Sequence, residues 1–132
     1  MTLRAGVRGS PQGFPRAARL LKHSDFERVY KLGRRHFSPH MTVFYLPQTV
    51  GAAGSASPRI GFTVGRVLGG AVERNRIKRR MREAVRRQRS IMKVPVDVVI
   101  NPRKSILALE FPLVLVEVGR AFETIEKKLA TK

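Results

Sequence analysis

The chain has no cysteine and no tryptophan, and only nine of its 132 residues are acidic. The absence of cysteine excludes disulfides and thiolate metal sites, and it fits a reducing compartment such as the cytoplasm. No apolar run approaches the roughly 20 residues that a membrane-spanning helix needs, so such a helix is excluded. Residues 1–13 also lack the apolar core of a secretory signal, so we expect none.

The shortage of acids leaves a large excess of positive charge. Lysine and arginine number 27, and the formal net charge is +18. A compact body with this charge repels itself, which favours a polyanionic partner. Nucleic acid is the expected partner. DNA and an anionic membrane surface are the alternatives that charge alone leaves open.

Composition divides the chain into a tail and one domain. Glycine, proline and arginine are frequent in residues 1–18, which predicts a flexible basic tail. Residues 19–132 predict a single α/β domain, since a chain of this length is ordinary for one domain, and this domain is expected to bind the nucleic acid. Within that domain, the small residues at 51–58 predict a flexible loop.

Hydrophobic periodicity predicts three helices and three strands. The first helix is expected to start with a capping box formed by Ser24 and Glu27 and to end at Gly33. Alternating or β-branched residues predict strands at 41–46, 60–64 and 94–100, with Asn101 and Pro102 closing the last of these. Further helices are expected at 71–88 and from Pro112 onward. The order α-β-β-α-β-α predicts an α/β (α+β) two-layer sandwich with a small sheet of about four strands.

The helix at 71–88 carries most of the functional signal. Nine of the sixteen residues from Arg74 to Arg89 are basic and one is acidic. Like charges one turn apart each cost a few tenths of a kcal/mol, so solubility alone explains this helix poorly. Guanidinium is planar and binds phosphate through two donors, which favours a nucleic-acid contact over a merely solvated face. An apolar stripe is expected to anchor the helix to the sheet: Ile77, Met81, Ala84 and Val85.

These residues also carry a family resemblance. The segments are Gly61-Phe62-Thr63-Val64-Gly65-Arg66, Gly69, Ala71-Val72, Arg74-Asn75-Arg76-Ile77-Lys78-Arg79 and Arg82-Glu83. Together they closely resemble the bacterial ribonuclease P protein subunit, and the likeness extends over about residues 19–130. It implies a catalytic RNA partner that removes the 5′ leader of precursor tRNA with Mg²⁺, the ions being bound mainly by RNA. It also implies a left-handed βαβ crossover, where periodicity alone would favour a right-handed one.

The same resemblance implies two groups of binding residues. One group would contact the catalytic RNA subunit: Arg74, Asn75, Arg76, Lys78, Arg79, Arg82 and Arg86. The other would hold the single-stranded leader in a cleft between the first helix and the sheet: Phe26, Tyr30 and Arg66. Read from periodicity alone, two aromatic residues four positions apart would more often belong to a core.

No residue of this chain is expected to be catalytic or to bind metal. His23, His36 and His40 lie outside any metal-binding or nucleophile signature, and the acids are scattered. The main alternative function is a general or ribosomal RNA-binding protein with no role in processing. A membrane-surface or DNA-binding protein is a further alternative, but the basic helix lacks the broad exposed apolar face that membranes require.

Overall fold

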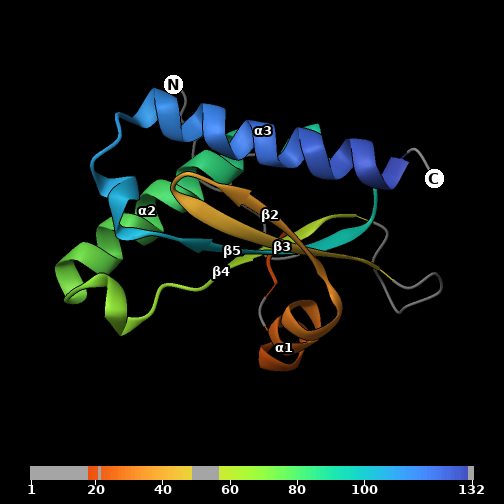
Figure 1. The fold of residues 1–132 in the computed structure, drawn as a ribbon, viewed down its shortest axis with the longest axis horizontal. Helices are drawn as coiled ribbons and strands as arrows, with labels where there is room; N and C mark the ends of the chain where they lie inside the picture. The colour runs from red at the N-terminus through yellow and green to blue at the C-terminus, as the bar shows by residue number, and fades with distance from the viewer. Residues whose placement is uncertain (1–17, 21, 49–56, 131–132) are drawn as a thin grey trace, which may run out of the picture.

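The computed structural model of the chain describes residues 18–20, 22–48 and 57–130. These residues form one four-stranded sheet with helices packed against it (Figure 1). The helices are α1 (His23–Leu32), α2 (Ala71–Gln88) and α3 (Phe111–Ala130). The strands are β2 (Arg34–Ser38), β3 (Met41–Pro47), β4 (Arg59–Phe62) and β5 (Val96–Pro102). Three short 3-10 helices complete the described elements: η2 (Arg66–Leu68), η3 (Arg89–Ile91) and η4 (Lys104–Leu107).

The sheet has the strand order β2-β3-β5-β4. β3 pairs antiparallel with β2 and with β5, whereas β4 pairs parallel with β5. A parallel pair needs a long crossover, and α2 supplies it between β4 and β5. The left-handed sense of this crossover stays a prediction.

Helices cover both faces of the sheet, which confirms the α+β class but gives three layers where two were expected. α2 and α3 pack together on one face, and α1 lies alone on the other (Figure 1). α1 forms the third layer because it has a small core of its own, in which Val29 packs with Leu20 and Val99. Central strand β5 is consequently buried on both sides, and Val98, Val99 and Ile100 are all fully buried.

The main core lies between the sheet and the α2–α3 pair. The predicted stripe of α2 is confirmed, since Ile77, Met81, Ala84 and Val85 are each 0% exposed. On α3, Val118, Phe122 and Ile125 are also fully buried. Val114 and Ala121 are buried in the same core, whereas Leu115 and Leu129 are only half-buried against it. Each such side chain contributes roughly 1.5–3 kcal/mol to folding.

The capping box predicted for the first helix is wrong. α1 begins at His23 with Lys22 as its N-cap, so Ser24 already lies inside the helix and cannot cap it. The Glu27 carboxylate instead lies 3.1 Å from His23 Nε2. The predicted end is confirmed, because Gly33 follows the helix and its N–H donates to the Val29 carbonyl.

β2 was not predicted from the sequence, and two of the predicted strands have different bounds in the structure. β2 was missed because it is an edge strand with three exposed residues in five, which resembles a charged loop. The strand predicted at 94–100 lies at 96–102, because the Val94 N–H donates to Glu126 of α3 whereas Pro102 pairs with Met41. β4 ends at Phe62 rather than at residue 64.

The predicted tail and loop fall mainly outside the described residues. This applies to residues 1–17 and to residues 49–56. Ala18, the last residue of the predicted tail, is 6% exposed and belongs to the main core. Arg19 forms a single parallel bridge with Ile60 of β4, so the chain enters the domain along this edge of the sheet.

Candidate nucleic-acid interface

The polar surface of α2 carries the residues predicted to contact the RNA subunit. Asn75, Arg76, Lys78, Arg79 and Arg82 are exposed, and none of their side chains forms a hydrogen bond or ion pair with the described part of the chain. The buried stripe fixes the helix on the sheet, and a turn of 3.6 residues directs these side chains away from it. Their charges are therefore available to an external anion.

Arg74 and Arg86, also predicted to contact RNA, differ from this exposed group. Arg74 is half-buried and its Nε donates to the Gly69 carbonyl at 3.2 Å. Arg86 is half-buried and forms an ion pair with Glu83, to which its Nε donates at 3.0 Å. Donation from Arg86, assisted by Arg87, lowers the pKa of Glu83 below its ordinary value of 4.5.

The basic side chains of α2 divide between two flanks of the helix. Lys78 and Arg82 lie one turn apart and face α1, where they line one hollow. The other flank faces the start of α3 and lines a second hollow with Arg76, Arg79, Arg80 and Arg87. A single basic helix thus borders two distinct concave surfaces.

The hollow on the α1 side is a cleft of about 270 Å³. Phe26 of α1 is half-buried and lines the cleft next to Gly61 of β4. A Cβ at position 61 would lie 2.5 Å from Cζ of Phe26, so a glycine is needed here for the ring to approach the strand. The cleft therefore combines an aromatic ring with the cations of α2, and its lining residues are Arg19, Leu20, Phe26, Ile60, Gly61, Phe62, Val64, Lys78 and Arg82.

The other two residues predicted to hold the leader do not line this cleft. Tyr30 lies one turn after Phe26 and is half-buried, with its ring edge-on to Phe44 at a centroid distance of 4.9 Å. The Tyr30 hydroxyl donates to Asn101 Oδ1 at 2.9 Å and lies 2.5 Å from Thr63 Oγ1. Arg66 is exposed on η2. The structure thus brings Phe26 together with Lys78 and Arg82, a grouping that the sequence did not predict.

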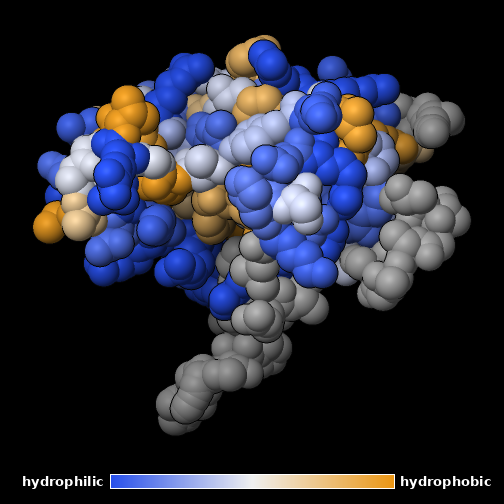
Figure 2. Space-filling model, turned by 90° about the horizontal axis from the view of Figure 1, so that it is seen from below, coloured by the Kyte–Doolittle hydropathy of each residue, from blue (hydrophilic) through white to orange (hydrophobic). Residues whose placement is uncertain are grey.

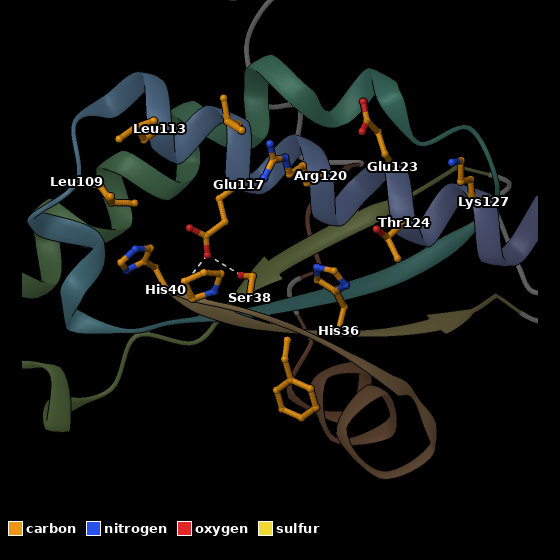
Figure 3. Close-up of a pocket in the computed structure, with 13 residues that line it drawn as sticks. His36, Ser38, His40, Leu109, Leu113, Glu117, Arg120, Glu123, Thr124 and Lys127 are labelled. Atoms are coloured by element: carbon orange, nitrogen blue, oxygen red, sulfur yellow. Dashed lines mark hydrogen bonds between the residues drawn. The ribbon is translucent and has the colours of Figure 1, made fainter.

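A further hollow lies between the β2–β3 hairpin and α3, away from these surfaces (Figure 3). Its lining mixes signs, with Glu117 and Glu123 beside Arg120 and Lys127. Glu117 accepts hydrogen bonds from the Ser38 hydroxyl and from the His40 backbone N–H. These hydrogen bonds hold the hairpin turn against α3. The two acids and two bases of the lining balance, so this hollow has no excess of positive charge.

Hydrophilic side chains dominate the face that carries α1, where hydrophobic residues form only separate small patches (Figure 2).

Among residues 18–20, 22–48 and 57–130, no three His, Asp or Glu side chains gather as a metal site. The described helices include none that combines the length and the apolar character needed to cross a bilayer.

Comparison with known proteins identifies the family. The family model described as "Ribonuclease P" matches residues 14–126. The ribonuclease P protein component of Geobacter sp. (strain M21) is 36% identical, over 89% of this chain and 96% of that protein. That of Symbiobacterium thermophilum is 37% identical, over 82% and 90%. The solved structure of the Thermotoga maritima RNase P protein has a TM-score of 0.70 at 28% identity, covering 82% of this chain and 97% of that one. The chain therefore belongs to the ribonuclease P protein family.

Proposed function

We propose that this chain is the protein subunit of ribonuclease P and assists the catalytic RNA in removing the 5′ leader from precursor tRNA. The observation that carries the proposal is the cleft in which Phe26 lies beside Lys78 and Arg82. Unpaired nucleotides stack on aromatic rings while their phosphates lie near cations, so the cleft suits a single-stranded leader.

Leader binding rests mainly on Phe26. Lys78 and Arg82 border the same cleft, so we extend the leader-binding group to them. Tyr30 keeps its proposed role through its ring, since its hydroxyl already bonds to Asn101. Arg66 is proposed to contact leader phosphates from η2, and its exposure supports this.

Contact with the RNA subunit rests on the exposed positions of α2. The side chains of Asn75, Arg76 and Arg79 extend from the exposed surface of α2 and form no hydrogen bond or ion pair with the described residues. We retain Arg74 and Arg86 in this group, where their hydrogen bonds to Gly69 and Glu83 preorganise the guanidinium groups. Arginine is favoured at such positions because its planar group binds phosphate through two donors.

We assign the chemistry of cleavage to the RNA subunit and no catalytic role to this chain. The Mg²⁺ ions of the holoenzyme are proposed to be bound mainly by RNA. The described residues do not fit a resident ion, because no three suitable ligands converge among them. Membranes and DNA are not proposed as partners, and location in the cytoplasm stays a prediction.

A reconstitution tests the proposed function. The full chain is mixed with the cognate catalytic RNA and a bacterial precursor tRNA at low magnesium, where the RNA alone cleaves slowly. We expect the chain to restore cleavage, and the chain alone to give none. Failure to restore cleavage would favour a general RNA-binding protein, and cleavage by RNA-free chain would contradict the assignment of chemistry to RNA.

The leader site has a sharper test in the assembled complex. Phe26→Ala should lower the affinity for precursor tRNA by about 1–3 kcal/mol per stacked base while leaving mature tRNA nearly unaffected. Phe37→Ala is the matched control, because Phe37 is 64% exposed on β2 and lies outside the cleft. Both variants must first be confirmed as folded by thermal unfolding. An unchanged ratio of precursor to mature affinity in Phe26→Ala would place Phe26 in the core alone.

A further inference from the structure

The second hollow beside α2 has a composition of its own. It has a volume of about 410 Å³ and lies between α2 and the first residue of α3. Four arginines and one glutamate of α2 line it, together with the aromatic ring of Phe111. We call it the Phe111 pocket. It shares no residue with the leader cleft, so the two hollows can be occupied independently.

The charges of the Phe111 pocket favour an anion. Its only acid, Glu83, is bonded to Arg86 and Arg87, so its charge is balanced within the helix. Arg76 and Arg79 are exposed and form no ion pair with any residue in the described ranges. Two uncompensated guanidinium groups one turn apart repel each other, and a phosphate between them removes that cost.

The aromatic side of the pocket is held in place. Arg80 Nη1 donates to the Leu109 carbonyl at 2.6 Å and to the Ile106 carbonyl at 3.3 Å, which fixes the segment leading into α3. Phe111 is half-buried, packs in part against the main core, and has the Arg87 guanidinium 5.6 Å from its ring centroid. An aromatic ring beside a planar guanidinium is a surface on which a base can stack.

We propose that the Phe111 pocket binds one unpaired nucleotide of the catalytic RNA, with its base against Phe111 and its flanking phosphates on Arg76 and Arg79. This inference rests on the proposed function. A nucleotide within a duplex keeps both base faces covered by its neighbours, so only an unpaired one can use the ring. The pocket thus adds recognition of local RNA structure to the attraction for phosphates, which is independent of sequence.

Binding of the full chain to the cognate catalytic RNA, measured over a range of salt concentrations, tests the proposal. Phe111→Leu keeps an apolar side chain but removes the stacking face. It should weaken binding by about 5- to 150-fold, the range that one stacked base supplies. The slope of affinity against salt should not change, because the variant keeps every charge. Phe111→Tyr should bind as the unaltered chain does, and so should the control Phe37→Leu, on exposed β2.

The outcomes separate this proposal from the proposed function. If folded Phe111→Leu binds normally while Arg76→Ala with Arg79→Ala binds weakly, the nucleotide pocket is wrong and the RNA interface on α2 stands. If neither variant is weakened, the α2 interface falls as well. Equal weakening in Phe111→Leu and Phe37→Leu would also overturn the pocket.

A second measurement on the unaltered chain covers the case in which Phe111→Leu does not fold. The complex with the catalytic RNA is irradiated with ultraviolet light, and the crosslinked peptide is identified by mass spectrometry. A base stacked on an aromatic ring is in direct contact with it and can form such a crosslink, so we expect a nucleotide adduct on Phe111. Adducts elsewhere on the chain but not on Phe111 would overturn the proposal.

Discussion

The arginines of the α1–β4 region and those of α2 differ in what lies next to them. Arg59 of β4 donates through two nitrogens to Asp97, at 2.9 and 2.8 Å, and lies 3.6 Å from Asp25. Arg28 of α1 completes the group through a 2.9 Å hydrogen bond to Asp25. Both aspartates are buried, at 8% exposure for Asp25 and 2% for Asp97. On α2, by contrast, Glu83 forms ion pairs with both Arg86 and Arg87. The exposed arginines at 76, 79 and 82 form no ion pair with any acid among the described residues.

The difference shows that acids, rather than arginines, decide the role of each basic residue. A buried carboxylate without a partner is costly, so Asp97 requires Arg59 and the pair fastens β4 to β5. An arginine with no acid nearby remains solvated and contributes to the external field of the molecule. With nine acids against 27 bases, most basic residues must fall into the second group.

Removing Asp97 should give the largest effect on stability. Asp97→Ala leaves Arg59, whose side chain is 26% exposed, without its bidentate partner. We expect a decrease of about 3 kcal/mol in the free energy of unfolding, measured by urea denaturation at neutral pH. Glu123→Ala, an exposed acid on α3, is the control and should change stability by less than about 0.5 kcal/mol. Similar decreases in both variants would show that the buried pair of Asp97 and Arg59 contributes no more to stability than an exposed acid does.

Removing two exposed arginines of α2 should affect binding rather than stability. For Arg76→Ala with Arg79→Ala, the log–log slope of RNA affinity against salt should fall by about 0.7–0.9 for each phosphate that the chain no longer neutralises. The free energy of unfolding should change by only a few tenths of a kcal/mol. Arg120→Ala with Lys128→Ala on α3 removes the same charge, and that variant should keep the original slope. If both pairs lower the slope equally, net charge and not the α2 surface governs binding.

Tyr30→Phe should separate the two roles of that side chain. It removes the hydroxyl that bonds to Asn101 and lies beside Thr63 but keeps the ring against Phe44. We expect stability to decrease by about 1 kcal/mol. The ratio of precursor to mature tRNA affinity, measured in the assembled complex, should not change. A lowered ratio would mean that the hydroxyl itself takes part in leader binding.

The smallest effect is expected for Glu83→Gln, which removes the acid that pairs with Arg86 and Arg87 on α2. The pKa of Glu83 is lowered in the folded chain, so its contribution to stability is present above pH 4.5 and is lost as pH falls through the lowered value. Solvent screens this pair, so the variant should be less stable by only a few tenths of a kcal/mol at neutral pH. Urea denaturation should show the two proteins converging at acid pH, and a difference that persists there would exclude the ion pairs as its cause.

Much of the fold could be predicted because its strongest signals are local. The limits of α2, its buried stripe and the strand beginning at Met41 follow from periodicity over one contiguous segment. β2 could not be predicted because Arg34 and Arg35 pair with β3 through backbone bonds that do not depend on side-chain type. The capping box failed because Ser24 and Glu27 satisfy the pattern from inside a helix that starts earlier.

The candidate site was predictable in its residues but not in its grouping. The basic helix was evident from charge, yet nothing in the sequence indicates that Lys78 and Arg82 border the cleft of Phe26. That grouping depends on how α1 and α2 lie on opposite faces of the sheet. Arg80 illustrates the same limit, since its carbonyl partners at 106 and 109 are fixed only by the fold. For Arg59, only tertiary structure indicates the buried partner Asp97.

Because α2 lies in the segment that connects the parallel strands β4 and β5, its charge has a consequence for folding kinetics. β4 and β5 can pair only after the helix joining them has become compact, and that helix is opposed by repulsion among its own cations. Added salt screens this repulsion, so refolding should become faster over the same range of ionic strength in which RNA binding becomes weaker. A polyanion acting during refolding should have the same accelerating effect, so the chain is expected to reach its native state fastest in the presence of the RNA that it binds.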